Sequence, residues 1–315
     1  MILLDEIRRA RSVLEGVAVC TPLVRLDVDT DAELWLKLEL LQPVRSFKIR
    51  GAGNAVLQAT DAELAGGVLT ASAGNMAQGL AYAARLRGVS ATVVVPEHAP
   101  DTKIAAVERY GGRVVKVPYD EWWETLVTGR SERATGLFVH PVADDRVMAG
   151  NGTIGLELLE QLDGFDAVVV PYGGGGLLTG IASAVKAERP EVRFYSAEPA
   201  TGAPAAAALA RGGEPVEVEY TPSFVDGSGS KALIPRVWEH VAGLIDGAFA
   251  VPLDDVAEAM RVLAERARVI PEGAGALSTA AALSGRVEGK RIVCIVSGGN
   301  VDASVFARVL QGETP

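Results

Sequence analysis

A run of four glycines, Gly173 to Gly176, stands between an apolar β-branched segment, Ala167–Pro171, and a helical pattern, Leu178–Ala187. Glycine lets backbone N–H groups approach a ligand closely, and the N-terminus of a helix adds partial positive charge. The order strand, glycine loop and helix therefore predicts a cradle for a phosphate or another anion. A flexible loop is the alternative, but four glycines beside a buried strand cost too much chain entropy for it.

Lys48 is one of seven lysines in a chain with 23 arginines, and it follows Phe47 at a predicted strand-to-helix transition. A lysine amine forms a Schiff base with a carbonyl compound. Pyridoxal phosphate carries both an aldehyde and a phosphate. Beside a phosphate cradle, Lys48 therefore indicates a pyridoxal-phosphate site, whereas a lone lysine at this position would be read as solvated.

Two further loops follow predicted strands. Ser72-Ala73-Gly74-Asn75 comes after Gly67–Ala71 and opens a helix, so its free N–H groups could hold a substrate carboxylate. Helix capping by Ser72 and Asn75 is the alternative. Ser297 ends the apolar segment Arg291–Val296, where its hydroxyl could bind a heterocyclic nitrogen or could simply form a turn.

Other motifs carry little chemistry. Gly150–Gly155 matches the pattern G-x-G-x-x-G, but it follows no strand directly and is interpreted as helix-start packing. The three histidines, His98, His140 and His240, lack metal-ligand spacing and are expected to be solvated or in the core. The sequence therefore predicts no metal site.

The composition fits a soluble globular protein. The 315 residues are 49% apolar and 22% charged, with a net charge of −10, which disfavours a nucleic-acid partner. Cys20 and Cys294 are too far apart in sequence to suggest a disulfide framework, and charges near the N-terminus argue against a signal peptide. The uncharged stretch Ala167–Val185 is broken by Pro171 and the glycines, so we expect no membrane span and a cytoplasmic protein.

The elements that must position these loops alternate between strand and helix patterns. Such alternation predicts an α/β fold with open, twisted, mostly parallel sheets covered by helices. The expected strands are Leu34–Leu38, Gly67–Ala71, Ala91–Pro96, Arg113–Val117, Leu137–His140, Ala167–Pro171, Arg193–Ala197 and Arg291–Val296. The expected helices are Met76–Arg87, Thr102–Tyr110, Thr153–Leu162, Leu178–Ala187 and Val256–Ala267, and Ala205–Ala208 is expected to be helical.

Together, Ser46-Phe47-Lys48-Ile49-Arg50-Gly51, Ser72–Asn75 and Gly173–Leu177 resemble the motifs of the threonine/serine dehydratase and serine racemase family. This family belongs to the pyridoxal-phosphate enzymes of the tryptophan synthase β type, fold type II. The resemblance runs from Thr21-Pro22-Leu23 to Ser297-Gly298-Gly299-Asn300. It implies a large cofactor domain, 1–50 and 147–315, with an inserted smaller domain, 51–146.

The resemblance also implies roles for residues. Lys48 is the Schiff-base lysine and the catalytic residue, Asn75 binds the phenolic oxygen of the cofactor, and Ser297 faces the pyridine nitrogen. Phe47 packs near the ring, and Glu272 matches an active-site glutamate motif. The phosphate is bound by backbone N–H groups of Gly173, Gly174, Gly175, Gly176 and Leu177. The substrate carboxylate is bound by Ser72, Ala73, Gly74 and Asn75.

Four positions depart from the family pattern. Met76 stands where the family usually has His, so we expect a less polar substrate pocket unless its side chain fills the core. Arg45 stands where Gly is common. Pro204 replaces an aspartate of the divalent-cation site, so we expect little activation by such ions. Ala73 replaces the serine of the racemases, so we expect little racemisation.

The resemblance implies a dehydratase (ammonia-lyase) that converts L-threonine or L-serine to a 2-oxo acid and ammonia. A serine racemase, or a dehydratase of another 3-hydroxy amino acid, is the enzymatic alternative. A non-catalytic pyridoxal-phosphate-binding regulatory protein is the alternative from another class. We expect a homodimer or a higher homo-oligomer, and no C-terminal regulatory domain, because the sequence ends at Pro315.

Overall fold

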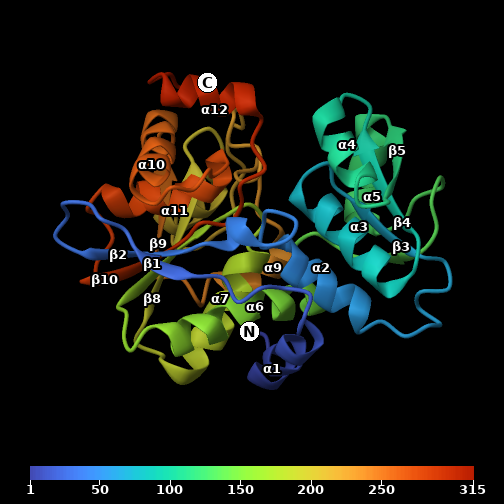
Figure 1. The fold of residues 1–315 in the computed structure, drawn as a ribbon, viewed down its shortest axis with the longest axis horizontal. Helices are drawn as coiled ribbons and strands as arrows, with labels where there is room; N and C mark the ends of the chain where they lie inside the picture. The colour runs from blue at the N-terminus through green and yellow to red at the C-terminus, as the bar shows by residue number, and fades with distance from the viewer.

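Apolar β-branched runs form the central strands of two separate sheets in the computed structural model, which describes residues 1–315 (Figure 1). The larger sheet has the strand order β1-β2-β10-β7-β8-β9. Only β1 is antiparallel to its neighbour, and every other pair is parallel. Its strands are β1 (Leu23–Arg25), β2 (Glu33–Lys37), β7 (Ala167–Pro171), β8 (Arg193–Pro199), β9 (Gly247–Val251) and β10 (Arg291–Ile295).

The smaller sheet has four parallel strands in the order β5-β4-β3-β6. These strands are β3 (Val68–Ala71), β4 (Ala91–Pro96), β5 (Arg113–Val117) and β6 (Leu137–Phe138). One face packs on α2 (Lys48–Leu57), α3 (Asn75–Arg87) and α4 (Asp101–Glu108), and the other face packs on α5 (Tyr119–Thr128).

Helices cover both faces of the larger sheet because residues of its strands alternate between two cores. Val168 and Val170 of β7 face one core, and Val169 faces the other. The first core is completed by α6 (Asp145–Gln161), α7 (Gly176–Glu188), α8 (Pro204–Ala210) and α9 (Pro235–Val241). The second is completed by α10 (Leu253–Arg266), α11 (Gly273–Leu283) and α12 (Ala303–Leu310). The remaining helices are α1 (Leu4–Val13), which packs on α6, and the short 3₁₀ helix η1 (Glu39–Leu41).

The expected fold class is confirmed, with local differences. The strands β1 and β9 were not expected from the sequence, since β1 has three residues and β9 is a half-exposed edge strand. The interpretation of Gly150–Gly155 as helix-start packing is wrong. These residues lie inside α6, which starts at Asp145 because the Asp144 side chain accepts hydrogen bonds from the backbone N–H groups of Arg146 and Val147.

The glycines inside α6 allow close helix packing. A Cβ on Gly150 would lie 2.3 Å from the Arg50 carbonyl oxygen of α2, and one on Gly152 would lie 3.0 Å from the Gly180 carbonyl oxygen of α7. Helix α6 therefore holds α2 and α7 at backbone contact. Figure 1 shows α2 between the larger sheet and the smaller one.

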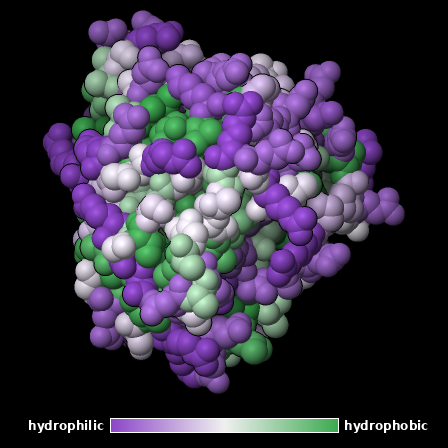
Figure 2. Space-filling model, turned by 90° about the vertical axis from the view of Figure 1, so that its right-hand side faces the viewer, coloured by the Kyte–Doolittle hydropathy of each residue, from purple (hydrophilic) through white to green (hydrophobic).

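The domain boundaries expected from the resemblance, at residues 50/51 and 146/147, fall inside α2 and α6. We keep the division as a proposal, because α2 packs on both α3 and α6. None of the helices combines the length and the hydropathy that a membrane span needs. The face of the molecule shown in Figure 2 is largely hydrophilic, with scattered hydrophobic side chains.

Candidate active site

Lys48 is the first residue of α2, and its half-buried side chain points to the segment that follows β6. Its Nζ donates a hydrogen bond of 2.8 Å to the Pro141 carbonyl oxygen and lies 5.1 Å from the centre of the Phe47 ring. Burial lowers the pKa of the Lys48 amine to about 8, although the charge of Glu272 opposes the shift. Near neutral pH roughly a tenth of this amine is therefore unprotonated, far more than for an exposed lysine with a pKa of about 10.4.

The glycine loop connects β7 to α7 at the carboxyl end of the larger sheet. Gly175 has a φ of +86°, a conformation that favours glycine. None of the backbone N–H groups from Gly173 to Leu177 donates a hydrogen bond within the protein. The loop and the first turn of α7 thus present five free donors, as an anion site requires.

The segment after β6 brings Lys48 and the glycine loop together. Lys48 binds Pro141, and the next residue, Val142, packs on the loop. A Cβ on Gly174 would lie 2.8 Å from the Val142 side chain, and one on Gly176 would lie 2.5 Å from its carbonyl oxygen. Because the amine and the free donors contact adjacent residues, they belong to one site.

The loop after β10 is joined to the segment that carries Lys48. The Ser297 carbonyl oxygen accepts a hydrogen bond of 3.0 Å from the Phe47 N–H, and Ser46 forms an antiparallel bridge with Gly298. Ser297 itself is buried. These contacts place Ser297 beside the base of α2.

Asn75 and Glu272 meet on the other side of the same loop. The Asn75 Nδ2 donates to Glu272 Oε1 at 2.7 Å, and Asn75 Oδ1 accepts from Asn300 Nδ2 at 2.7 Å. Burial raises the pKa of the Glu272 carboxyl to about 8, with a further contribution from the charge of Asp226. These contacts connect α3 of the smaller sheet to α11 and the β10 loop of the larger one.

The segment from Ser72 to Asn75 leads into α3, whose N-cap is Gly74 and not a polar side chain. The capping interpretation of Ser72 is therefore wrong; its hydroxyl accepts a 3.3 Å hydrogen bond from the Gly74 N–H. The N–H groups of Ala73, Asn75 and Met76 donate no hydrogen bond within the protein. They form a second group of free donors beside Asn75.

These residues fit pyridoxal phosphate by their free donors and by the Lys48 amine. Five unused N–H groups with no Cβ on four of the residues suit a phosphate, and a half-buried amine of lowered pKa suits the attachment of an aldehyde. The two features contact adjacent residues, Pro141 and Val142.

The structure shows the surroundings of two further side chains, those of Met76 and His140. Met76 does not line a substrate pocket, because it is 1% exposed and packs in the core of the smaller sheet with Ala52 and Leu80. His140 is not simply a core residue: its Nδ1 accepts from the N–H groups of Val142 and Ala143. Burial and the nearby Lys48 amine lower the pKa of His140 to about 4.

Sequence reasoning missed the contribution of Pro141 and Val142, and of Asn300 as a partner of Asn75. The position of Pro141 and Val142 after the predicted strand Leu137–His140 was the available signal, since ligands bind at the carboxyl ends of parallel strands.

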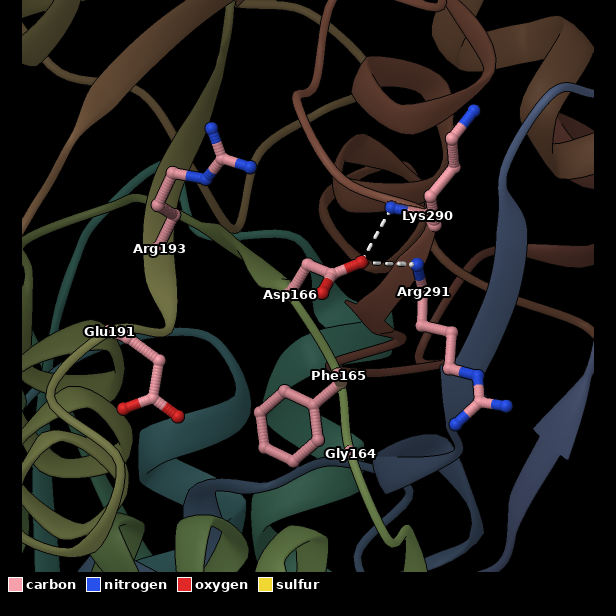
Figure 3. A pocket seen from close by; sticks show the side chains of 7 residues that line it. All are labelled: Gly164, Phe165, Asp166, Glu191, Arg193, Lys290 and Arg291. Atoms are coloured by element: carbon pink, nitrogen blue, oxygen red, sulfur yellow. Dashed lines mark hydrogen bonds between the residues drawn. The ribbon is translucent and has the colours of Figure 1, made fainter.

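A separate groove of about 550 Å³ lies at the amino ends of the strands of the larger sheet. Asp166, Arg193 and Arg291 line it where β7, β8 and β10 begin, and Asp166 accepts hydrogen bonds from the N–H groups of Lys290 and Arg291 (Figure 3). Because the glycine loop follows the carboxyl end of β7, this groove is not part of the site around Lys48.

Comparisons with known proteins give the family of the chain. Residues 14–298 match the family model described as "Pyridoxal-phosphate dependent enzyme". The chain belongs to this family, and its cofactor is pyridoxal phosphate.

Individual relatives are similar over nearly the whole chain. L-threonine ammonia-lyase of Thermotoga maritima is 39% identical over 99% of this chain and 79% of its own. Among solved structures, maize serine racemase has a TM-score of 0.90 and 32% identity, covering 98% of this chain and 97% of its own. A threonine deaminase from T.th. has a TM-score of 0.87 and 35% identity, covering 95% of this chain and 99% of its own.

Proposed function

We propose that this chain is an ammonia-lyase that converts L-threonine, and also L-serine, to the corresponding 2-oxo acid and ammonia. The observation that carries the proposal is the half-buried Lys48 amine, of lowered pKa, beside the free donors of Gly173 to Leu177. The 39% identity to an L-threonine ammonia-lyase supports the choice of reaction.

The residues that would hold the cofactor are those around Lys48. Lys48 would bind it covalently, and the N–H groups of Gly173 to Leu177 would bind its phosphate. Phe47, Asn75 and Ser297 would contact its ring, with Glu272 behind Asn75. Pyridoxal phosphate, when bound, supplies an electrophilic carbon and a conjugated ring that accepts electron density from the substrate.

The side chains of the protein would then move protons and hold the substrate. The N–H groups of Ala73, Asn75 and Met76 would bind the substrate carboxylate, because they lie free at the start of α3. The Lys48 amine, with a pKa of about 8, can accept the Cα proton near neutral pH. Ser297 offers the ring a neutral hydroxyl instead of a carboxylate, which favours loss of the β-hydroxyl over transamination. The eliminated product is then hydrolysed by water to the 2-oxo acid and ammonia.

A serine racemase is the second candidate, favoured by the TM-score of 0.90 to maize serine racemase. Ala73 argues against it. Racemisation needs a proton donor on the face of the carbanion opposite Lys48, and a methyl group cannot supply one. A dehydratase of another 3-hydroxy amino acid remains the alternative within the same chemistry.

The proposal also includes the cellular location and the oligomeric state of the protein. Cys20 is exposed, Cys294 is buried, and both are free thiols, which supports a reducing, cytoplasmic location. We also infer a homodimer or a higher homo-oligomer, which light scattering of the purified protein would measure.

A 2-oxo acid assay across a panel of 3-hydroxy amino acids tests the activity. We expect equal amounts of 2-oxo acid and ammonia from L-threonine and L-serine, and none from the variant Lys48→Ala. Bound cofactor without 2-oxo acid from any substrate would identify a non-catalytic binding protein. D-serine formed from L-serine as fast as pyruvate would identify a racemase.

A further inference from the structure

Four charged side chains that the proposed reaction does not use are buried in one group, which includes Arg50, two residues after Lys48 in α2. They come from four different elements: β2, η1, α2 and α6. Their side chains are between 0% and 9% exposed, and two are positive and two negative. These residues are Lys37, Glu39, Arg50 and Glu157, and we call them the buried charge cluster.

Arg50 is the centre of the cluster because its guanidinium binds both carboxylates. Its Nε and Nη2 donate to the two oxygens of Glu39, each at 2.8 Å. Its Nη1 and Nη2 donate to the two oxygens of Glu157 at 2.6 and 3.0 Å. The Thr153 hydroxyl and the Val19 carbonyl oxygen accept the remaining bonds. Every nitrogen of the guanidinium is therefore satisfied.

Lys37 completes the charge balance. Its Nζ donates to Glu157 Oε2, to the Thr21 carbonyl oxygen and to Gln161 Oε1, at 2.5, 2.7 and 2.8 Å. Burial alone would raise the pKa of Glu39, but the charges of Arg50 and Lys37 hold it below its usual value. The cluster thus balances two formally positive and two formally negative side chains, and each of them is hydrogen-bonded within the cluster.

Stability is a weak explanation for such a cluster, because well-packed apolar residues in place of a buried ion network often leave stability unchanged or raise it. What the cluster provides is a fixed geometry, because a bidentate guanidinium sets direction as well as distance.

That geometry acts on the first turn of α2. Arg50 is two residues from Lys48, and the N-cap of the helix, Phe47, makes no side-chain capping bond. The helix is instead clamped through Arg50 to Glu39 on one side and to Glu157 on the other. Gly150 allows α6 to touch the backbone of Arg50 at the same point.

We propose that Arg50, through Glu39 and Glu157, is a positioning residue that sets the direction in which the Lys48 amine leaves α2. The proposal rests on the function proposed above. Its consequence is that loosening the clamp misaligns the Lys48 amine without removing it, both for attachment of the cofactor and for proton transfer from the substrate.

The double variant Arg50→Met, Glu39→Gln tests the proposal. It removes one positive and one negative charge and leaves the Lys37–Glu157 pair in place. We expect kcat for L-threonine to fall about tenfold to a hundredfold, since small misplacements carry costs of that order, with little change in KM. The kinetic isotope effect with Cα-deuterated L-threonine should rise, because proton transfer by Lys48 becomes more rate-limiting.

A second measurement does not depend on the lyase activity. The rate at which pyridoxal phosphate attaches to the apoprotein, followed by visible absorbance, should fall about tenfold in the same variant. If wild-type protein attaches the cofactor but turns over no hydroxy amino acid, the proposed function fails. The attachment rates of the two proteins still decide the positioning role.

Controls separate positioning from general damage. The variant Arg261→Gln, Glu258→Gln removes an ion pair of α10 and should change neither rate. If the double variant does not fold, the variant Arg50→Lys tests the positioning role in the same assays. It keeps the positive charge but cannot bind Glu39 and Glu157 with a planar guanidinium. A folded variant with the attachment rate, kcat and isotope effect of the wild type would overturn the proposal.

Discussion

Lys48 gains its chemistry from its surroundings. Its amine is half-buried, bound to one carbonyl oxygen and of lowered pKa, so it becomes a nucleophile at a pH where an exposed lysine is almost fully protonated.

The pH dependence of cofactor attachment follows from this pKa. Below pH 8 the Lys48 amine is mostly protonated and cannot attack an aldehyde, so the attachment rate to the apoprotein should rise with pH and level off above about 8. Stopped-flow absorbance measures this rate. Borohydride reduction and peptide mapping should place the label on Lys48. A label on another lysine, or a rate that still rises towards pH 10, would contradict the assignment.

Ala73 is predicted to set the balance between elimination and racemisation. With L-serine, we expect pyruvate to form much faster than D-serine, because general acid–base help is typically worth ~10²–10⁴-fold and Ala73 offers none. Chiral analysis of the remaining serine measures the ratio. The variant Ala73→Ser should raise D-serine formation, whereas Ser72→Ala should leave the ratio unchanged. D-serine at the rate of pyruvate in the wild type would refute this prediction.

Arg45 holds a backbone conformation that suits glycine, with a φ of +59°. The variant Arg45→Gly should stabilise the protein by about 0.5–1 kcal/mol, because a side chain in the left-handed region is strained. Thermal unfolding measures the change. The matched control is Arg45→Ala, which removes the long side chain but keeps the strain. If both variants gain equally, backbone strain is not the cause.

At the scale of elements, the first turn of α8 binds the carboxylate of Glu198. The resemblance implies that family members with a divalent-cation site use this carboxylate to bind the ion. The buried Glu198 of β8 accepts hydrogen bonds from the N–H groups of Ala205 and Ala206, at 3.1 and 2.9 Å, in the first turn of α8. Pro204, just before them, has no carboxylate to offer. The polar partners of Glu198 at this point are therefore backbone donors.

This arrangement predicts an activity that does not depend on divalent cations. A chelator should cause no measurable loss of 2-oxo acid release, and added magnesium or calcium should cause no gain, because hard cations need several oxygen ligands. The assay is run on protein stripped of metal and then resupplied. Loss of activity on stripping, with recovery on addition of either ion, would show that other oxygens complete a cation site.

The elements also show what a sequence can predict. The strand β7 and its glycine loop were predicted because an apolar run and four glycines give a strong local signal. The start of α6 was missed because Gly150 and Gly152 look like helix breakers, whereas they serve close packing against α2 and α7. Whether such a glycine ends a helix or lies inside it depends on tertiary contacts, which a local sequence pattern does not contain.

At the scale of the whole molecule, the site is built from loops of both sheets. The resemblance predicts Lys48 and the glycine loop in one site, and in the structure they contact the adjacent residues Pro141 and Val142. Of the two alternatives for Met76, a pocket position or core filling, the structure shows core filling, since a family position does not say which way a side chain points. The buried charge cluster could not be foreseen, because Arg50 and Glu157 read as surface residues until folding brings them together.

The stability of the whole fold should depend on pH through Glu198. Burial raises its pKa to about 7, against the opposing hydrogen bonds from α8. Between its unfolded pKa of 4.5 and about 7, the folded state holds a proton that the unfolded state has lost. Its contribution is therefore present below pH 4.5 and lost as the pH rises through 7.

The variant Glu198→Gln tests this, because an amide does not titrate. Its stability relative to the wild type should increase with pH, by on the order of 1–3 kcal/mol between about pH 5 and 8. Denaturant unfolding at several pH values measures the difference. Glu265→Gln, an exposed position on α10, is the control and should show no such trend. An equal difference for Glu198→Gln at every pH would contradict the assignment.

The order of strands in the larger sheet has a consequence for synthesis of the chain. β10, which pairs with both β2 and β7, is the last strand to leave the ribosome. The smaller sheet uses only strands between residues 68 and 138, so its pairings are all available once that segment has emerged. The N-terminal strand β2, in contrast, cannot pair with β10 until more than half of the chain has been synthesised after it. The nascent protein therefore exposes the edge of β2 for most of its translation, which is the interval in which chaperones have most to protect.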